Sequence, residues 1–428
     1  MGTLPDSPRD RASEPRHAME TGSIIGRAEL FSRVYERVMR HEFDPLAVVI
    51  ECSHSAVEAT VRGRRTILFG TNSYLGLNFH PACIEAAVDA SRLSGTGSTA
   101  SRVASGNTRG HVSLESALAE FYGRRSAIVF STGFMANLGV ISGLARTGDA
   151  IFLDEYCHAS ILDACRSSGA HVELFRHNDA NDLARLFARS GVPGSRTIVA
   201  VEGVYSVWGD LADLRNLLAV AKKKGAFTIV DEAHGFGIYG AGGRGASEHL
   251  GVEDQVDIIV GTFSKSAGVI GGFCVSDLHA LRALRIMSRS YLYTASLPPA
   301  VVAAAQTAIR LIRFQPELRA AAWRNARALR AGLTELALPI VGGDGPIGSI
   351  RMPSVKTGLS FWTELLDRGI YMNLLVPPST PDKAPVLRFS VSAAHTKAHI
   401  EEALHAMAAA CSVLNAPKGS SVQSSIPA

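Results

Sequence analysis

The fold is decided by two short stretches, Val230-Asp231-Glu232-Ala233-His234 and Gly261-Thr262-Phe263-Ser264-Lys265-Ser266. Each follows an apolar, β-branched run, Phe227–Val230 in the first case and Val256–Val260 in the second. Short apolar runs that end in glycine or polar residues are typical of buried strands. Strands that are one crossover apart are usually parallel neighbours. We therefore expect both carboxyl ends to lie side by side, at the edge where open α/β sheets bind ligands.

Strand-like and helical segments alternate through the central part of the chain. This order favours a doubly wound α/β sheet of seven mostly parallel strands. The connection from Gly261 to Gly272 is too short for a helical crossover, so we expect an antiparallel strand there, at the edge of the sheet. The predicted strands are Ala127–Phe130, Ala150–Leu153, Val172–Phe175, Thr197–Val201, Phe227–Val230, Ile258–Val260 and Gly272–Val275.

The sequence pattern changes near residue 300, where Ala/Arg/Leu-rich helices precede short strands, near 370–374 and 386–391 among others. This order is typical of a small α+β domain beside the large one. The two ends of the chain are polar and lack an apolar period, which predicts a mobile leader at 1–22 and a disordered tail. The expected divisions are an N-terminal leader and arm at 1–70, a large domain at 71–312, a small domain at 313–415 and a tail at 416–428.

Composition limits the class of protein. The 428 residues are 46% hydrophobic and 19% charged, with a net charge of +4, as expected of a globular enzyme. The six cysteines show no Cys-x-x-Cys spacing, so neither a disulfide framework nor a metal site is predicted, and the cytoplasm is the expected compartment. No basic block favours nucleic-acid binding, and no run of about 18 apolar residues predicts a membrane span. Peripheral contact with a membrane stays open.

An acid, a histidine and a lysine should meet at the two strand ends. Lys265 stands among hydroxyl side chains that can hold a phosphate, and burial would lower its pKa towards that of a useful nucleophile. A lysine beside a carboxylate is what pyridoxal 5'-phosphate (PLP) needs for its covalent attachment. Asp231 could keep the pyridine nitrogen of PLP protonated, and His234 could reach its phenolic oxygen. The alternatives are a surface lysine, a helix-capping aspartate and a core histidine.

Other strand ends add candidate ligands. Gly133 and Phe134 follow a strand and open a helix, where free backbone N–H groups can bind an anion. His158 follows another strand and could stack on a flat ring. A nucleophilic pair with Cys157 is disfavoured, because sequence neighbours rarely face each other. Arg388 lies in an apolar strand and would need a partner there, such as a substrate carboxylate.

Together these segments resemble the α-oxoamine synthase family of PLP enzymes, over residues 42–410. The resemblance rests on Asn72-Ser73-Tyr74-Leu75-Gly76, Ser101-Arg102 and the two stretches around Asp231 and Lys265. Within the family the chain is most similar to the soluble bacterial serine palmitoyltransferases, because serines flank Lys265 where other branches usually have Gly-Lys-Ala. The resemblance implies the aspartate aminotransferase-like fold of PLP enzymes, known as fold type I. It also implies a homodimer with shared active sites.

The resemblance implies a role for each candidate residue. Lys265 would bind the cofactor covalently and act as general base, and Asp231 would pair with the pyridine nitrogen. His158 would stack on the cofactor ring, and His234 would contact the phenolic oxygen. Thr294 would reach the phosphate from the second subunit. The remaining candidates are Gly133, Phe134, Thr262 and Ser264 for the phosphate and ring edge, and Arg388, with Asn72 and Tyr74 nearby, for the amino-acid carboxylate.

The implied reaction is the decarboxylative condensation of an amino acid with an acyl-CoA, where serine and palmitoyl-CoA would give 3-oxosphinganine, CoA and CO2. Two positions depart from the bacterial serine palmitoyltransferases. Val376 replaces an arginine that often precedes Pro377-Pro378, and Asn72-Ser73-Tyr74 replaces Tyr-Asn-Tyr. A synthase that uses alanine or glycine, or another thioester such as acyl-carrier protein, stays open, as does a PLP aminotransferase. A non-catalytic subunit is disfavoured because Lys265 is present.

Overall fold

The computed structural model describes residues 23–39, 45, 47–377 and 379–414. The chain divides into two units, Met1–Val48 and Val49–Ala428. In the first unit the structure describes one helix, α1 (Ile24–Met39). The predicted leader at 1–22 and tail at 416–428 lie outside the described residues. The expected domain boundaries stay a prediction.

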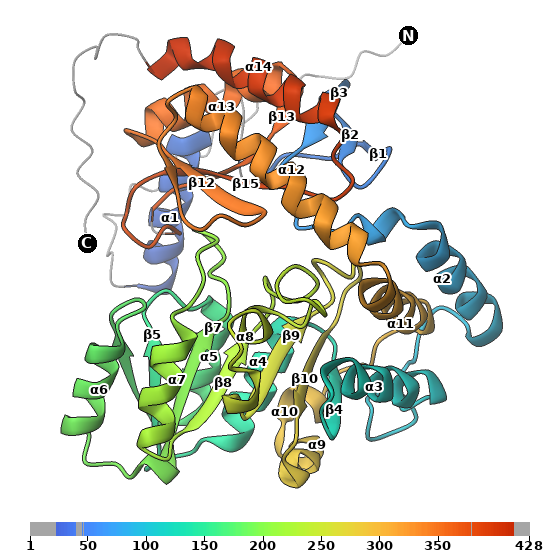
Figure 1. Ribbon diagram of the computed structural model, residues 1–428, viewed down its shortest axis with the longest axis vertical. Coiled ribbons are helices and arrows are strands. Elements are labelled where there is room, and N and C mark those ends of the chain that lie inside the picture. The colour runs from blue at the N-terminus through green and yellow to red at the C-terminus, as the bar shows by residue number, and fades with distance from the viewer. Residues whose placement is uncertain (1–22, 40–44, 46, 378, 415–428) are drawn as a thin grey trace, which may run out of the picture. The chain divides into compact units, whose positions relative to one another are not determined.

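A seven-stranded sheet forms the centre of the second unit (Figure 1). Its strands are β4 (Ser126–Phe130), β5 (Ala150–Asp154), β6 (His171–Phe175), β7 (Thr197–Glu202), β8 (Phe227–Asp231), β9 (Ile258–Thr262) and β10 (Gly272–Ser276). They lie in the order β4-β10-β9-β8-β7-β5-β6, and every strand except β10 runs in the same direction. All seven predicted strands are confirmed, each within two residues of its expected bounds.

Strand β10 is antiparallel, as the short connection after Gly261 predicted, but its predicted place at the edge of the sheet is wrong. Gly272 lies opposite Thr262 of β9 on one side and opposite Phe130 of β4 on the other. Strand β4 comes much earlier in the chain and takes the edge position instead. The length of a connection determines the direction of the next strand, but it carries no information about which distant strand will pair with its free side.

Helices cover both faces of this sheet (Figure 1). One face packs against α4 (Gly133–Leu144), α5 (Ala159–Ser168), α9 (Leu284–Met287) and α10 (Arg289–Leu292). The other packs against α3 (Arg109–Tyr122), α6 (Ala180–Arg189), α7 (Leu214–Lys223) and α11 (Pro299–Phe314). Successive residues of one strand enter different cores, because side chains alternate across a sheet. In β4, for example, Val129 belongs to one core and Phe130 to the other. Two further helices of this part of the chain are α2 (Pro81–Ser94), against α11, and the short α8 (Ala246–His249).

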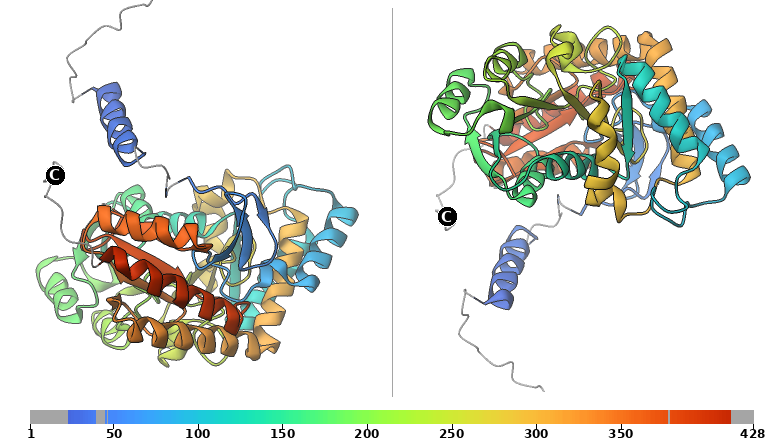
Figure 2. Two further views of the ribbon diagram at one scale, coloured as in Figure 1. Left: turned by 90° about the horizontal axis from the view of Figure 1, so that it is seen from above. Right: turned by 90° about the horizontal axis from the view of Figure 1, so that it is seen from below.

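The C-terminal part contains a second, antiparallel sheet. Its strands are β11 (Ile340–Val341), β12 (Ile347–Arg351), β14 (Asn373–Leu375) and β15 (Val386–Ser390). They lie in the order β11-β12-β15-β14. The accompanying helices, which Figure 2 shows beside this sheet, are α12 (Pro316–Glu335), α13 (Val355–Asp367) and α14 (Lys397–Leu414). This arrangement agrees with the α+β pattern of the sequence.

The region 370–374 supplies strands to two different sheets. Its first strand, β13 (Ile370–Tyr371), pairs in parallel with β3 (Arg64–Leu68). In the same sheet β3 pairs with β2 (Glu58–Val61), and β2 pairs with β1 (Cys52–Ser53). The break falls at Met372, whose carbonyl accepts the Trp362 indole N–H at 2.9 Å. Residues on both sides of the large domain in sequence therefore fold together. Across the part of the chain that the structure describes, no helix is long and apolar enough to cross a membrane.

Candidate active site

The carboxyl ends of β8 and β9 lie side by side, as the two opening stretches predicted. The strands pair in parallel, with Asp231 opposite Val260. A cavity of about 390 Å³ borders both ends. Most of the predicted site residues line it, namely Gly133, Phe134, His158, Asp231, His234, Thr262, Ser264 and Lys265. The sheet thus brings together side chains from four separate strand ends.

Asp231 is fixed in the cavity wall by two hydrogen-bond donors. The side-chain amide of Asn137 donates to one carboxylate oxygen at 2.7 Å, and the Ala233 N–H donates to the other at 2.8 Å. Hydrogen bonds of this kind stabilise the charged form of a carboxyl group. Sequence reasoning missed Asn137. The signal that could have found it is a lone amide within the apolar helix that Gly133 opens.

Lys265 lines the same cavity, in the loop after β9. Desolvation is the main cause that lowers the pKa of its ammonium group to about 8, while the neighbouring carboxyl groups, above all that of Asp231, oppose the shift. A fraction of the lysine is therefore uncharged near neutral pH, and the uncharged amine is the form that acts as nucleophile and base. The loop is held by Ser266, whose hydroxyl donates to the Phe236 carbonyl at 2.6 Å.

Two histidines line the cavity. His158 begins α5, where its Nδ1 accepts the Ser160 N–H at 3.2 Å, and much of its ring is exposed to the cavity. An open imidazole face of this kind suits stacking on a flat ring. His234 is buried, and its Nδ1 lies 2.7 Å from the Tyr74 hydroxyl. Burial is the main cause that lowers the pKa of both histidines, so both are neutral at pH 7.

Arg388 in β15 is buried and lies outside the cavity lining. Its guanidinium donates to three neutral oxygens, those of the Ser206 carbonyl at 2.6 Å, the Ser390 hydroxyl at 3.2 Å and the Asn72 side chain at 3.2 Å. Tyr74 donates to the same Asn72 oxygen at 3.0 Å, and its hydroxyl also contacts His234 in the cavity wall. Asn72 and Tyr74 therefore connect Arg388 to the cavity. The positive charge of Arg388 thus remains available to a substrate carboxylate.

The start of α4 provides an anion site. Thr132 caps the helix by accepting the Met135 N–H at 3.1 Å, and Gly133 borders the cavity in the first turn. A larger residue does not fit at this glycine, because its Cβ would lie 2.9 Å from the Thr262 side chain. The hydroxyls of Thr262 and Ser264, 2.9 Å apart, line the cavity with the free N–H groups of the helix. The helix N–H groups and the Ser264 hydroxyl can donate to a phosphate group, and the Thr262 hydroxyl, which donates to the Gly271 carbonyl at 2.8 Å, would have to turn to do so.

The donor set fits PLP. Phosphate donors, a charged carboxylate for a pyridinium nitrogen, an open imidazole face for the ring and a partly uncharged lysine for the aldehyde all border one cavity. The sequence-based prediction of a PLP site therefore agrees with the geometry of the chain.

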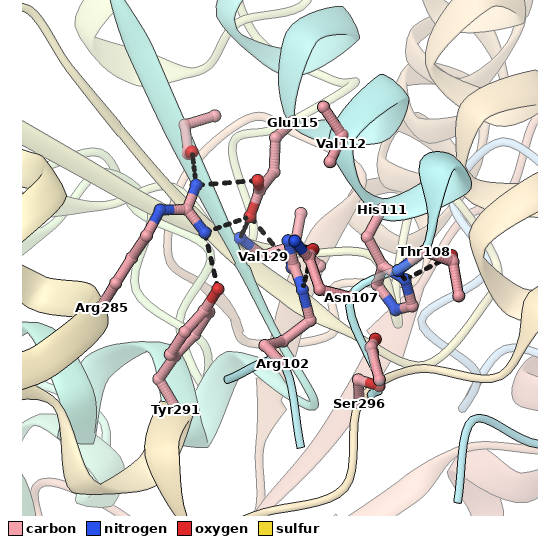
Figure 3. A network of polar contacts seen from close by, with 12 residues as sticks. Arg102, Asn107, Thr108, His111, Val112, Glu115, Val129, Arg285, Tyr291 and Ser296 are labelled. Atoms are coloured by element: carbon pink, nitrogen blue, oxygen red, sulfur yellow. Dashed lines mark hydrogen bonds and ion pairs between the residues drawn. The ribbon is translucent and has the colours of Figure 1, made fainter. Parts of the chain in front are cut away.

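Thr294 lies apart from this cavity within the single chain. It borders a separate cavity of about 10 Å³, which Arg102 also lines. Beside it, Glu115 forms ion pairs with Arg102 at 3.0 Å and Arg285 at 2.8 Å, and Arg285 donates to the Tyr291 hydroxyl at 2.6 Å (Figure 3). This network ties α10, the segment before Thr294, to Glu115 of α3. The expected role of Thr294 in a partner's site stays a prediction.

A charged histidine braces the loop that carries His158. The two ring nitrogens of His177 lie 3.0 Å from Asp154 and 2.8 Å from Asp210, and its ring stacks on Tyr156. Burial opposes protonation of His177, but the hydrogen bonds to both carboxylates outweigh it and raise its pKa to about 9. The folded state therefore binds this proton more tightly than the unfolded chain does.

The stability that this proton contributes should depend on pH. Because the folded pKa is raised, the contribution is complete below about pH 6.5, the ordinary histidine pKa, and is lost as the pH rises through about 9. The stability difference between wild type and His177→Gln should narrow by about 2–3 kcal/mol over this range. Urea unfolding at several pH values measures it, with the exposed His171→Gln as control. A difference that is constant with pH would contradict the prediction.

Comparison with known proteins agrees with this geometry. Residues 64–407 match the family described as aminotransferase class I and II. A serine palmitoyltransferase from Caulobacter vibrioides is 49% identical over 371 residues, which cover 86% of this chain and 92% of that protein. An 8-amino-7-oxononanoate synthase from Stutzerimonas stutzeri is 39% identical over 352 residues, covering 82% and 89%. A solved structure of a serine palmitoyltransferase variant from S. paucimobilis, with a bound PLP–myriocin aldimine, is similar with a TM-score of 0.89 at 41% identity, covering 92% of this chain and 99% of that one.

Proposed function

Since the chain belongs to the aminotransferase class I and II family, and within it to the α-oxoamine synthases, we propose that it condenses L-serine with palmitoyl-CoA to give 3-oxosphinganine, CoA and CO2. The predicted family, fold type and cofactor are confirmed. The main observation in favour of this reaction is that Lys265 and Asp231 line one cavity. Arg388 is connected to that cavity through the uncharged side chains of Asn72 and Tyr74. Identity to the Caulobacter serine palmitoyltransferase supports serine as the amino acid.

Bound PLP supplies a carbonyl for covalent attachment and an electron sink for the charge left on the α-carbon of the amino acid. Lys265 would hold it covalently, and Asp231 would keep its pyridine nitrogen protonated. The N–H groups of Gly133 and Phe134, with the Thr262 and Ser264 hydroxyls, would hold its phosphate. His158 would lie against its ring, and the neutral His234 would orient its phenolic oxygen.

The chain's own residues would then control one proton and one carboxylate. Arg388 would bind the carboxylate of serine with two parallel N–H bonds and so fix the α-carbon near Lys265. The Lys265 amine, partly uncharged because its pKa is about 8, would take the α-proton at Nζ. Asn137 and the Ala233 N–H donate to the Asp231 carboxylate and hold it in place during this step. The acyl group of the thioester would then bond to the α-carbon, and CoA and CO2 leave.

The proposal includes a homodimer in which Thr294 enters the partner's site. This would explain why Thr294 lies outside the Lys265 cavity of its own chain. A cytoplasmic location belongs to the same proposal. Size-exclusion chromatography with light scattering tests the dimer, and mixed dimers of Lys265→Ala and Thr294→Ala chains test the shared site. In such mixed dimers one intact site is expected, since both changes can fall in the same site.

The reaction is tested by the mass of its product. The holoenzyme would be incubated with serine, alanine or glycine and with palmitoyl-CoA, a shorter acyl-CoA or an acyl-carrier-protein thioester. The expected product is 3-oxosphinganine, from serine and palmitoyl-CoA. Preferential products from alanine or glycine, or from the carrier protein, would favour a related α-oxoamine synthase. Amino transfer to a keto acid without release of CO2 would favour an aminotransferase.

Val376 offers a separate prediction about the carboxylate of the substrate. The side chain is half-buried and stands immediately before Pro377-Pro378, where the related enzymes often have an arginine. Val376→Arg should lower the KM for serine roughly threefold to tenfold, because a second guanidinium would add a charge-assisted hydrogen bond worth about 1 kcal/mol. Steady-state kinetics measures it, with Val376→Met as the uncharged control. An unchanged KM would mean that Arg388 binds the carboxylate by itself.

A further inference from the structure

Glu202 and Asp231 are two buried carboxyl groups at the ends of neighbouring strands. Strands β7 and β8 pair in parallel, and Glu202 lies directly opposite Asp231. The two residues are 2% and 6% exposed, and both line the cavity that contains Lys265. Two like charges in such a poorly solvated place strongly disfavour joint ionisation. One of the two carboxyl groups should therefore carry a proton.

The hydrogen-bond donors decide which one is charged. Asp231 accepts two N–H bonds, one on each oxygen, from Asn137 and Ala233. Within the described part of the chain, the Glu202 carboxyl accepts one, from the backbone N–H of His158. Because donors stabilise the charged form of a carboxyl group, the negative charge belongs on Asp231.

The charged groups around Glu202 also favour a neutral Glu202. Asp231 of β8 and Asp154 of β5 oppose its ionisation, and Lys265 after β9 and the His158 N–H favour it. Burial is the largest cause, and together with Asp231 it raises the pKa of Glu202 well above its ordinary value. The single lysine and the single N–H do not outweigh burial and two carboxylates.

We propose that Glu202 is a positioning residue that stays protonated near neutral pH and holds the His158 backbone against the cofactor site. As a neutral carboxyl it fixes the start of α5, and so the imidazole that lies over the cofactor ring. It does this without a second negative charge beside Asp231, which remains the anion for the pyridine nitrogen. The inference depends on PLP binding and not on the choice of amino acid or acyl donor, so it can fail or hold independently of the proposed reaction.

Infrared spectroscopy can detect this proton directly. The difference spectrum of wild-type holoenzyme minus Glu202→Gln holoenzyme at pH 7.5 should contain the C=O stretching band of a protonated carboxyl group. The band should move to lower frequency in D2O. A difference confined to the bands of an ionised carboxylate would overturn the proposal.

Cofactor affinity separates a positioning role from a general structural one. Glutamine can accept the His158 N–H as the neutral acid does, so Glu202→Gln should bind PLP within about threefold of wild type. Glu202→Ala removes the acceptor and should weaken PLP binding tenfold or more. The matched control is Asp154→Asn. Asp154 ends β5, accepts two backbone N–H groups and faces the charged His177. Asp154→Asn should lower the urea midpoint of unfolding, because it replaces a charged carboxylate with a neutral amide. Equal loss of PLP affinity in Glu202→Gln and Glu202→Ala would refute the proposal.

The pH dependence of the cofactor's absorbance tests the proposal with Glu202→Gln alone, so the test does not require Glu202→Ala to fold. The absorbance of PLP bound to Lys265 changes with protonation, and its midpoint reports the charge near that lysine. Glu202→Gln should leave the midpoint unchanged, since neither side chain carries a charge. If Glu202 were ionised, loss of its negative charge would destabilise the protonated form and move the midpoint to lower pH. Such a downward shift would contradict a protonated Glu202.

Discussion

Replacement of Lys265 with alanine is expected to abolish the condensation of serine with palmitoyl-CoA. The change removes both the covalent attachment point of PLP and the base that takes the α-proton, so the loss should exceed about a thousandfold. Product mass and CoA release measure it. The fold should survive, because the Lys265 amine borders the cavity and the loop is held by Ser266 and its neighbours instead.

The control for this experiment is Lys222→Ala. Lys222 is a partly exposed lysine at the end of α7, paired with Asp257 at 2.8 Å, away from the cavity. It should keep activity within about twofold, because surface ion pairs contribute little. Substantial turnover in Lys265→Ala, with a normal near-ultraviolet spectrum, would show that another residue binds the cofactor and removes the proton.

Asp231→Asn is expected to keep PLP bound but to lose most of the proton removal. Asparagine keeps the shape of the side chain and loses the negative charge that holds the pyridine nitrogen protonated, so exchange of the serine α-proton should slow by about 10²–10⁴-fold. One amide N–H₂ group would also meet a donor, either Asn137 or the Ala233 N–H, at a cost of about 1–3 kcal/mol of stability. The rate is measured by NMR as deuterium exchange in D2O, without acyl-CoA.

The matched control is Asp89→Asn, an exposed aspartate on α2 near Arg92. It loses the same charge at a distance from the cavity and should exchange the α-proton at the wild-type rate. If Asp231→Asn also exchanged at that rate with PLP bound, the pyridine nitrogen would not depend on Asp231. The role inferred from its place at the end of β8 would then be wrong.

The sequence by itself predicted the sheet and the centre of the site, for a physical reason. Buried parallel strands must be apolar and β-branched on both faces, so their runs and the polar residues after them are visible in the chain. Asp231 and Lys265 each follow such a run at a strand's carboxyl end, and parallel pairing brings the ends together. The glycine that opens α4 and the short connection that reverses β10 are equally local signals.

Only the tertiary structure decided which distant residues meet. The pairing of β10 with β4, the bond from Asn137 to Asp231 and the Glu202 carboxyl opposite Asp231 each join residues far apart in the chain. Local periodicity reports whether a residue is buried, but not which partner it meets there. The contacts of Arg388 and the separation of Thr294 from the Lys265 cavity depend in the same way on packing between remote segments. The sequence thus determined the chemistry of the site, and the packing of remote segments determined how its charges are arranged.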